Sequence, residues 1–139
     1  MSGKGEILSH DEKMQVVKAL QAIRKKVSWK SGKDQVHLAK RQRMGHLLPT
    51  ASISDYEHVV LDIVGDESNV VYLYQFGKDY YYGVRGFPEA REWLVIFGAG
   101  GVMETAFPPE DMDEYLERRG FVLLGHVREI LRWTKEAKS

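Results

Sequence analysis

The hydrophobic pattern is most informative between Glu92 and Pro109, where an apolar run, a glycine-rich turn and a second, half-apolar run follow one another. Trp93–Phe97 is rich in β-branched and aromatic residues, Gly98–Gly101 can adopt positive φ angles, and Pro108 ends the second run. This is typical of two strands joined by a short turn. Because side chains alternate between the faces of a strand, the first strand is apolar on both faces. We therefore expect it to be the buried central strand of a mainly antiparallel sheet.

Two helices are predicted in the N-terminal part of the chain. Ser9 and Glu12 have the spacing of a capping box, and apolar residues recur behind them at helical spacing, which predicts a helix over residues 10–26. A Ser/Gly break follows. After it, Asp34 is expected to cap a second helix, which Gly45 ends.

A third helix and a first hairpin come next. Ser54 and Glu57 form a second possible capping box in front of an apolar stripe, which predicts a helix over residues 55–64. Two aromatic runs, residues 70–76 and 80–85, are separated by a Gly-Lys-Asp turn, which is typical of a hairpin. Together with the two strands around the glycine-rich turn, they predict a four-stranded meander.

The C-terminal part of the chain is predicted to be mainly helical. The acidic residues that follow Pro109 favour a helix that continues to Arg119 and is closed by Gly120. Residues 121–124 fit at most an edge strand, and residues 126–135 have a second helical pattern.

This order of helices, strands and helices predicts an α+β fold, with N-terminal helices packed on a four-stranded mainly antiparallel sheet and with C-terminal helices. A length of 139 residues is typical of one domain, so we expect a single domain over residues 1–139. Its core is expected at about residues 34–108. A helical N-terminal extension over residues 9–27 and a helical C-terminal addition over residues 109–136 complete it.

Composition excludes several classes of protein. The chain has no cysteine, which excludes a disulfide framework and thiolate metal sites. No apolar run approaches the roughly 18–20 residues that cross a bilayer. No apolar stretch follows the polar N-terminus as it does in a secretory signal. We therefore expect a cytoplasmic protein with no membrane partner.

Charge is distributed unevenly along the chain. The net charge is zero, but residues 1–50 hold 11 Lys and Arg against 4 acidic residues, whereas residues 51–139 hold 9 against 16. Such an asymmetry is typical of a basic surface that binds phosphates. The alternative is that the two halves attract each other within one fold.

The basic half contains the sequence HLAKRQRMGH, which places His37 and His46 on either side of Lys40 and Arg41. Imidazole acts as base and acid near pH 7, while Lys and Arg neutralise a phosphate and the charge of its transition state. These are the groups that metal-independent RNA cleavage requires. The alternative interpretation is a solvated helix face with incidental histidines.

Other candidate features are weaker. The hydroxyl of Thr105 is able to bond a phosphate from a rigid strand, but an outward threonine on a strand is also ordinary. His58 and Asp62 lie four residues apart on a predicted helix, yet a metal site needs at least a third ligand. The turn at Gly98–Gly101 has neither dinucleotide nor P-loop spacing. We therefore expect no metal and no cofactor.

A family resemblance is carried by the order of these segments. A basic helix with a histidine, a Gly-His step, the helix DYEHVVLDIVGD, two aromatic strands and EWLVIFGAGGVMETAFP follow one another. This order resembles the barnase, EndoU, colicin and RelE (BECR) superfamily of RNase toxins, in particular its phage-borne and polymorphic-toxin branches. The resemblance covers about residues 36–108, and the strand pattern and the TAFP ending carry most of it.

The resemblance implies a metal-independent endoribonuclease whose helices pack on an antiparallel sheet, with RNA on the open face. It implies that His37 and His46 are the acid and base, that Lys40 and Arg41 bind the phosphate, and that Thr105 supplies a hydroxyl. The implied reaction is attack of a 2′-hydroxyl on the adjacent phosphodiester. The implied partners are RNA and a cognate antitoxin or immunity protein, in a toxin of phage or mobile-element origin.

Two other functions are open at this point. The same fold and the same basic helix are also suited to holding nucleic acid or a protein partner without catalysis. Alternatively, the acidic segment from Glu110 to Glu117 meets a basic partner, as in an antitoxin or immunity protein.

Overall fold

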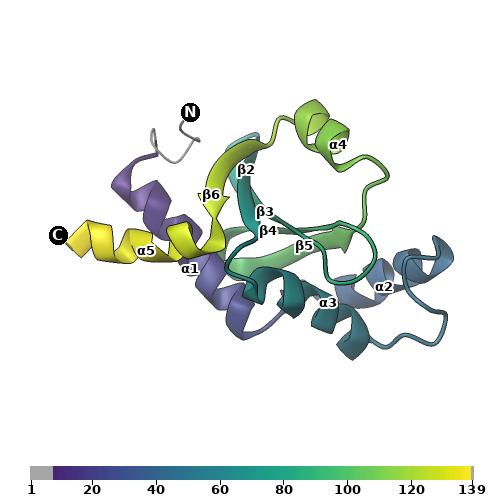
Figure 1. Ribbon diagram of the computed structural model, residues 1–139. Coiled ribbons are helices and arrows are strands. Elements are labelled where there is room, and N and C mark those ends of the chain that lie inside the picture. The colour runs from purple at the N-terminus through teal and green to yellow at the C-terminus, as the bar shows by residue number, and fades with distance from the viewer. Residues whose placement is uncertain (1–7, 139) are drawn as a thin grey trace.

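A computed structural model describes residues 8–138, in which a six-stranded mixed sheet is flanked by five α-helices (Figure 1). The helices are α1 (His10–Lys25), α2 (Lys33–Arg43), α3 (Ile53–Gly65), α4 (Met112–Arg119) and α5 (Val127–Lys138). The strands are β1 (Ser28–Trp29), β2 (Val70–Phe76), β3 (Asp79–Gly86), β4 (Trp93–Phe97), β5 (Val102–Phe107) and β6 (Val122–His126), and a 3₁₀ turn, η2 (Ala99–Gly101), precedes β5. The predicted α+β class is confirmed.

The sheet has more strands than predicted. Its order is β1-β5-β4-β3-β2-β6, and β2 to β5 form the predicted antiparallel meander. β1 is a parallel partner of β5, and β6 is an antiparallel partner of β2. The prediction of a four-stranded sheet is therefore wrong in strand number. The reason is that β1 has only two residues, too few to show a strand periodicity, and β6 overlaps the segment that fitted at most an edge strand.

The predicted central strand is confirmed. β4 lies between β3 and β5, and all five of its residues are buried. The turn after it brings Gly101 against α1: a Cβ atom at this position would lie 2.9 Å from the carbonyl oxygen of Ala19 and 2.9 Å from the Cβ of Ala22. Gly101 also has a φ of 82°. Both the backbone angle and the close approach to α1 therefore require glycine.

Helix starts follow the residues that cap them. The predicted capping box of Ser9 and Glu12 is present at the start of α1. α2 begins after Gly32, so Asp34 lies in its first turn and is not its cap. α4 begins later than predicted, because Asp111 accepts a hydrogen bond from a backbone N–H of its first turn.

The cap of α3 corrects another prediction. Ser52 and Asp55 exchange the two hydrogen bonds of the capping box, so the predicted pair of Ser54 and Glu57 is wrong. Glu57 instead accepts a hydrogen bond from Nε1 of Trp29 at 2.9 Å, which ties α3 to β1. Of two overlapping cap motifs the structure thus uses the first, while the acidic residue of the second contacts a residue that is far away in the sequence.

The two faces of the sheet are covered unequally. On one face, α1, α3 and α5 form the main hydrophobic core with the sheet, with Leu20, Tyr56 and Phe97 among its fully buried residues. On the other face, a smaller cluster around Leu94 and Met112 is covered by one helix, α4. In Figure 1, α1 and α5 lie side by side, while α4 stands apart from the other helices. The second face is therefore only partly covered.

Candidate functional site

The C-terminal part of α2 carries a buried arginine. Leu38 and Arg41 are three residues apart and face the interior, and Arg41 is only 3% exposed. Nη1 of Arg41 donates a hydrogen bond to Nδ1 of His46 at 3.1 Å. The guanidinium also lies over the Phe107 ring, 5.5 Å from its centroid, and its Nε atom has no hydrogen-bond partner.

No Asp or Glu in residues 8–138 forms an ion pair with Arg41. Burial of the guanidinium lowers the pKa of Arg41, and the nearby Tyr56 opposes this effect. A buried cation without an acidic partner costs free energy. Such an arrangement is typical of a functional site, and it indicates a position for an anion.

Tyr56 connects α3 to the outer edge of β5. β5 pairs with β1 only at Val102 and Met103, which leaves the following part of this edge without a strand partner. The hydroxyl of the buried Tyr56 fills the gap, because it donates to the Ala106 carbonyl at 2.7 Å and accepts from the Ala106 N–H at 3.3 Å. Burial raises the pKa of Tyr56, while the bond to Ala106, the charge of Arg41 and a hydrogen bond with Thr105 oppose the rise.

His46 is a half-buried residue just beyond α2, and its ring meets the Trp93 ring edge-on at 6.3 Å. Burial lowers its pKa below the ordinary value of 6.5, and the charges of Arg41 and Arg91 lower it further. Because a guanidinium can only donate, Nδ1 of His46 must accept, which places the proton on Nε2. In the free protein His46 is therefore a neutral donor.

The rings of Trp29 and Tyr56 lie between His37 and His46. His37 stacks on Trp29 at 5.8 Å, and Trp29 in turn lies 5.5 Å from Tyr56. Its Nδ1 atom is buried without a hydrogen-bond partner. Burial lowers the pKa of His37 most and nearby positive charges, Arg41 first, lower it further, whereas Glu104 raises it. His37 is thus also favoured in its neutral form.

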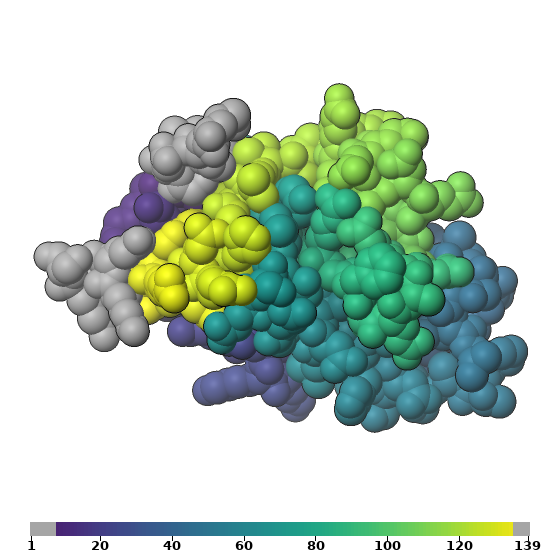
Figure 2. Space-filling model, in the orientation of Figure 1, coloured from purple at the N-terminus to yellow at the C-terminus, as the bar shows by residue number. Residues whose placement is uncertain are grey.

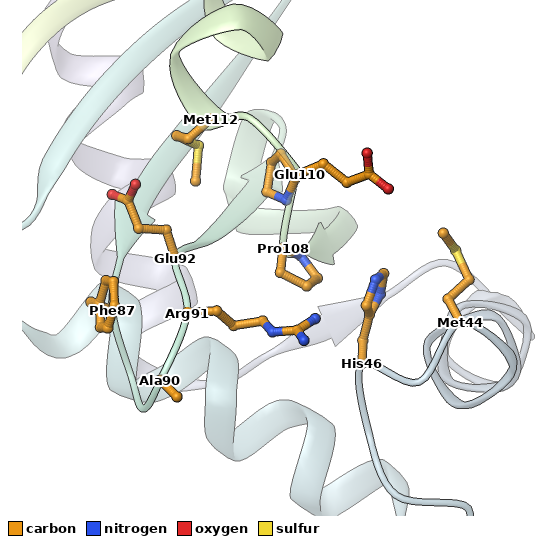
Figure 3. Close-up of a pocket in the computed structure, with 10 residues that line it drawn as sticks. Met44, His46, Phe87, Ala90, Arg91, Glu92, Pro108, Glu110 and Met112 are labelled. Atoms are coloured by element: carbon orange, nitrogen blue, oxygen red, sulfur yellow. The ribbon is translucent and has the colours of Figure 1, made fainter.

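His46 opens onto a cleft between α2 and α4, formed by two adjoining cavities of about 570 and 420 Å³. Both cavities are lined by Met44, His46, Pro108, Pro109 and Glu110. Figure 2 shows the loop between β3 and β4 at the surface between the segments of α2–α3 and α4. In Figure 3, Arg91 extends from this loop toward His46. The cleft therefore has an imidazole and a guanidinium facing each other.

The charged groups of the cleft differ in whether they have partners. Arg91 and Glu110 form no ion pair with any residue of the described range. The other carboxylates of the cleft are engaged in ion pairs or in the cap of α4, and they are Glu92, Asp111 and Glu114. Glu110 and Arg91 are thus the cleft residues whose charges have no ionic partner within the described range, whereas Arg41 lines neither cavity and contacts the cleft through His46.

The structure brings the five predicted site residues together only in part. Arg41 and His46 are in contact, and Thr105 is joined to them through Tyr56. Of the five, only His46 lines the cavities of the cleft; Arg41 reaches the cleft through His46, and His37 interacts with Arg41 only through its charge. Lys40 is an exposed residue on α2.

The sequence alone did not assign three residues to this site, namely Tyr56, Arg91 and Glu110. Tyr56 belongs to the apolar stripe of a predicted helix. A helical pattern does not reveal that the hydroxyl of this tyrosine reaches a strand edge. Arg91 lies in a segment without periodicity before the central hairpin, and Glu110 is predicted in the first turn of the helix after it, which begins only at Met112. Only the folding of both segments onto the end of α2 shows that they share a cavity with His46.

Comparisons with known proteins leave the site to be interpreted from its own geometry. The chain matches no protein-family model, no curated protein and no solved structure. Among the described residues, no three His, Cys, Asp or Glu side chains are grouped so as to hold a metal ion. No helix within the same range is long and apolar enough to cross a membrane.

Proposed function

We propose that this protein is a metal-independent endoribonuclease-like protein that binds RNA in the cleft between α2 and α4. The observation that carries the proposal is the pair of Arg41 and His46, a buried guanidinium without an acidic partner that is hydrogen-bonded to an imidazole of the cleft. A guanidinium binds phosphate oxygens in a forked geometry, and Arg91 adds a second cation. Membership of the BECR superfamily, a toxin-like role and a cytoplasmic location belong to the same proposal.

In the proposed reaction, Glu110 accepts the proton of a 2′-hydroxyl, and the 2′ oxygen attacks the adjacent phosphorus. The bond between phosphorus and the 5′ oxygen breaks, and protonated His46 gives its proton to that oxygen. Arg41 and Arg91 stabilise the negative charge on the nonbridging oxygens. The products are a 2′,3′-cyclic phosphate end and a 5′-hydroxyl end.

The substrate itself supplies the conditions under which His46 takes up a proton. In the free protein, Nδ1 of His46 is occupied by the hydrogen bond from Arg41. A phosphate oxygen is a charged and therefore stronger acceptor for Arg41, and its negative charge raises the pKa of His46. Binding of RNA thus releases Nδ1 and favours the imidazolium that the reaction needs.

Incubation of the purified protein with single-stranded RNA in EDTA tests this proposal. Cleavage with 2′,3′-cyclic phosphate ends is expected, and His46→Ala and Glu110→Gln should each lower the rate by about 10²–10⁴. His58→Ala is the matched control, because His58 is an exposed histidine of α3 that lies outside the cleft. A protein that neither cleaves nor binds RNA would end the proposal.

The variant His37→Ala decides between two choices of the second proton-transfer group. The sequence predicts His37 as the partner of His46, whereas the shared lining of the cleft by His46 and Glu110 supports Glu110 in this role. With Glu110 in this role, His37→Ala should keep most of the rate. A large loss in His37→Ala together with an unchanged rate in Glu110→Gln would restore the pair of histidines.

The second candidate is a non-catalytic RNA-binding module. The observation in its favour is that both histidines have a lowered pKa and that Nδ1 of His46 accepts a hydrogen bond from Arg41 in the free protein. In that case RNA binding should fall steeply with salt, because each neutralised phosphate releases counterions, and Arg91→Ala should flatten this dependence. Cleavage would then be absent in every variant. In either case a partner of the antitoxin or immunity type would act by covering the cleft.

A further inference from the structure

A second concave surface lies next to the cleft, on the part of the sheet that α4 leaves open. We call it the aromatic groove; its volume is about 270 Å³ and its lining residues come from β2, β3, β4, β5, α4 and the segment after α4. Most of them are aromatic: Tyr74, Phe76, Tyr81, Tyr115 and Phe121. Tyr115 also lines the second cavity of the cleft. A chain bound in the cleft is therefore able to continue into the aromatic groove.

The rings of the groove hold one another in place. Tyr74 stacks on Phe121 with centroids 4.9 Å apart, and it lies 6.2 Å from Tyr81 and 6.4 Å from Phe76. Phe76 is nevertheless 66% exposed. The other rings are half-buried, and an exposed ring beside a cluster of half-buried rings is a candidate binding surface. Their flat faces suit a planar ligand.

The polar groups of the groove indicate which chemical properties a ligand needs in order to bind there. The hydroxyls of Tyr74, Tyr81 and Tyr115 have no hydrogen-bond partner within the described residues. Arg119 lies over the Tyr115 ring at 5.0 Å and forms no ion pair there. The acidic residue of the groove, Glu104, is already paired with a lysine at 3.4 Å. The ligand that fits is flat, has polar edges and carries a negative charge.

We propose that the aromatic groove binds one nucleobase of single-stranded RNA, stacked on Phe76 and Tyr81, with the neighbouring phosphate facing Arg119. This inference rests on the proposed function, because it adds a base subsite to the phosphate site of the cleft. The groove is smaller than the roughly 300–1,000 Å³ of pockets that enclose whole drug-sized ligands, which suits a single base. Bases of a duplex stay stacked on each other, so the substrate class is single-stranded RNA.

Equilibrium binding of a labelled RNA with 2′-O-methyl groups, which cannot be cleaved by 2′-hydroxyl attack, tests the base subsite. Phe76→Ala and Tyr81→Leu should each weaken binding of the single strand by about 5- to 100-fold, the usual contribution of stacking one base on an aromatic ring. An abasic oligomer of equal charge should bind the wild type more weakly, and neither variant should weaken it further. Tyr81→Phe keeps the ring and removes only the hydroxyl, so as the matched control it should weaken binding much less than Tyr81→Leu.

The outcomes separate the base subsite from the phosphate site. If Arg91→Ala weakens binding while Phe76→Ala and Tyr81→Leu bind as tightly as the parent, the base subsite is wrong and the proposed function stands. The groove would then be left to a protein partner. If the wild type binds no RNA even at low salt, both are wrong. Thermal unfolding of each variant shows whether a loss of binding is a loss of fold.

Discussion

The face of the sheet that packs on α1, α3 and α5 differs from the opposite face in what fills it. On the first face, long helices place apolar side chains against the strands, and the residues between them are almost completely buried. On the second face, the eight residues of α4 cover only part of the strands, and the cleft and the aromatic groove stay open. Dense apolar burial therefore dominates one face of the sheet, while concave surface remains on the other.

The two faces also differ in how their helices are attached. α4 is tied to the sheet by Arg85 of β3, which binds Asp113 at 2.8 Å and Glu92 at 2.7 and 3.1 Å. The hydrogen bonds with Glu92 hold the pKa of Arg85 well above its ordinary value. Helices on the first face are attached mainly by apolar burial, which is stronger per residue than partly exposed ion pairs. The helix on the partly covered face is thus held by a small apolar cluster and by partly exposed ion pairs.

The largest expected effect is on the free energy of unfolding. It compares the loss of a buried ring from the first face with the loss of an exposed ring from the second. Phe97→Ala removes a fully buried ring from the first face and should lower the free energy of unfolding by about 3–5 kcal/mol. Phe76→Ala removes a ring that is mostly exposed on the second face and should change it by less than about 0.5 kcal/mol. Urea unfolding measures both. Equal losses would contradict the assignment of stability to the first face.

A second comparison uses two neighbouring glycines with the same type of backbone angle. Gly101→Ala adds a Cβ against the backbone of α1, and it should cost about 2–4 kcal/mol. Gly100 has a φ of 70° but open space around it, so Gly100→Ala should cost only about 1–2 kcal/mol of backbone strain. Urea midpoints give the difference, which isolates the packing of η2 on α1. A Gly101→Ala variant as stable as Gly100→Ala would show that α1 is free to shift.

The third comparison concerns two arginines, Arg85 with acidic partners and Arg41 without one among the described residues. Arg85→Met leaves two carboxylates without their cation and should cost about 1–3 kcal/mol. Arg41→Met replaces a buried cation without an acidic partner, so the free energy of unfolding should change by less than about 1 kcal/mol or rise. Its RNA affinity should fall at the same time. Urea unfolding measures the stability of each variant, and RNA binding is measured on the same samples. A strongly destabilised Arg41→Met would make Arg41 a structural residue.

The smallest expected effect is the pH dependence of stability near neutrality. His37 and His46 have a pKa below 6.5 because both are desolvated and lie near Arg41. The folded protein therefore binds fewer protons than the unfolded chain below about pH 6.5, and the free energy of unfolding should fall as the pH drops from 7 to 5. Replacing both histidines by Asn should flatten this slope. Urea unfolding at pH 7, 6 and 5 is the measurement, and a stability that rises toward pH 5 would be the opposite result.

The carboxyl groups with a lowered pKa affect the stability of the protein at lower pH than the histidines do, and they serve as the internal control. Their lowered pKa values come from hydrogen bonds to nearby backbone and side-chain groups, and the affected residues are Asp55, Asp66 and Glu129. Because their ordinary values are 3.8 and 4.5, the stability that they contribute is lost only at lower pH. The range between pH 7 and 5 therefore reports on the histidines.

The elements of this protein follow from local patterns in its sequence. The uninterrupted apolar run Trp93–Phe97 is the buried central strand, and Ser9 with Glu12 starts α1 as its spacing predicts. The two hairpins also follow from runs of β-branched and aromatic residues that are separated by glycine turns. Such features were predictable because strand alternation and helix capping depend on residues that are close in the chain.

What the sequence left undecided depends on contacts between distant segments. The parallel pairing of β1 with β5 joins residues about 70 positions apart, and two residues carry no periodic signal of their own. Likewise, Ser52 caps α3 in place of Ser54, and Glu57 of the alternative motif is bonded to the distant Trp29.

The candidate site shows the same division. The sequence alone determined that His37, Arg41 and His46 belong to one basic helix and its end. Only the tertiary structure decided that Arg41 is buried against His46 and that Glu110 lines the same cleft, while His37 does not. The physical reason is that burial and the distance between charges are properties of the packed molecule, and these determine which groups are available to a ligand.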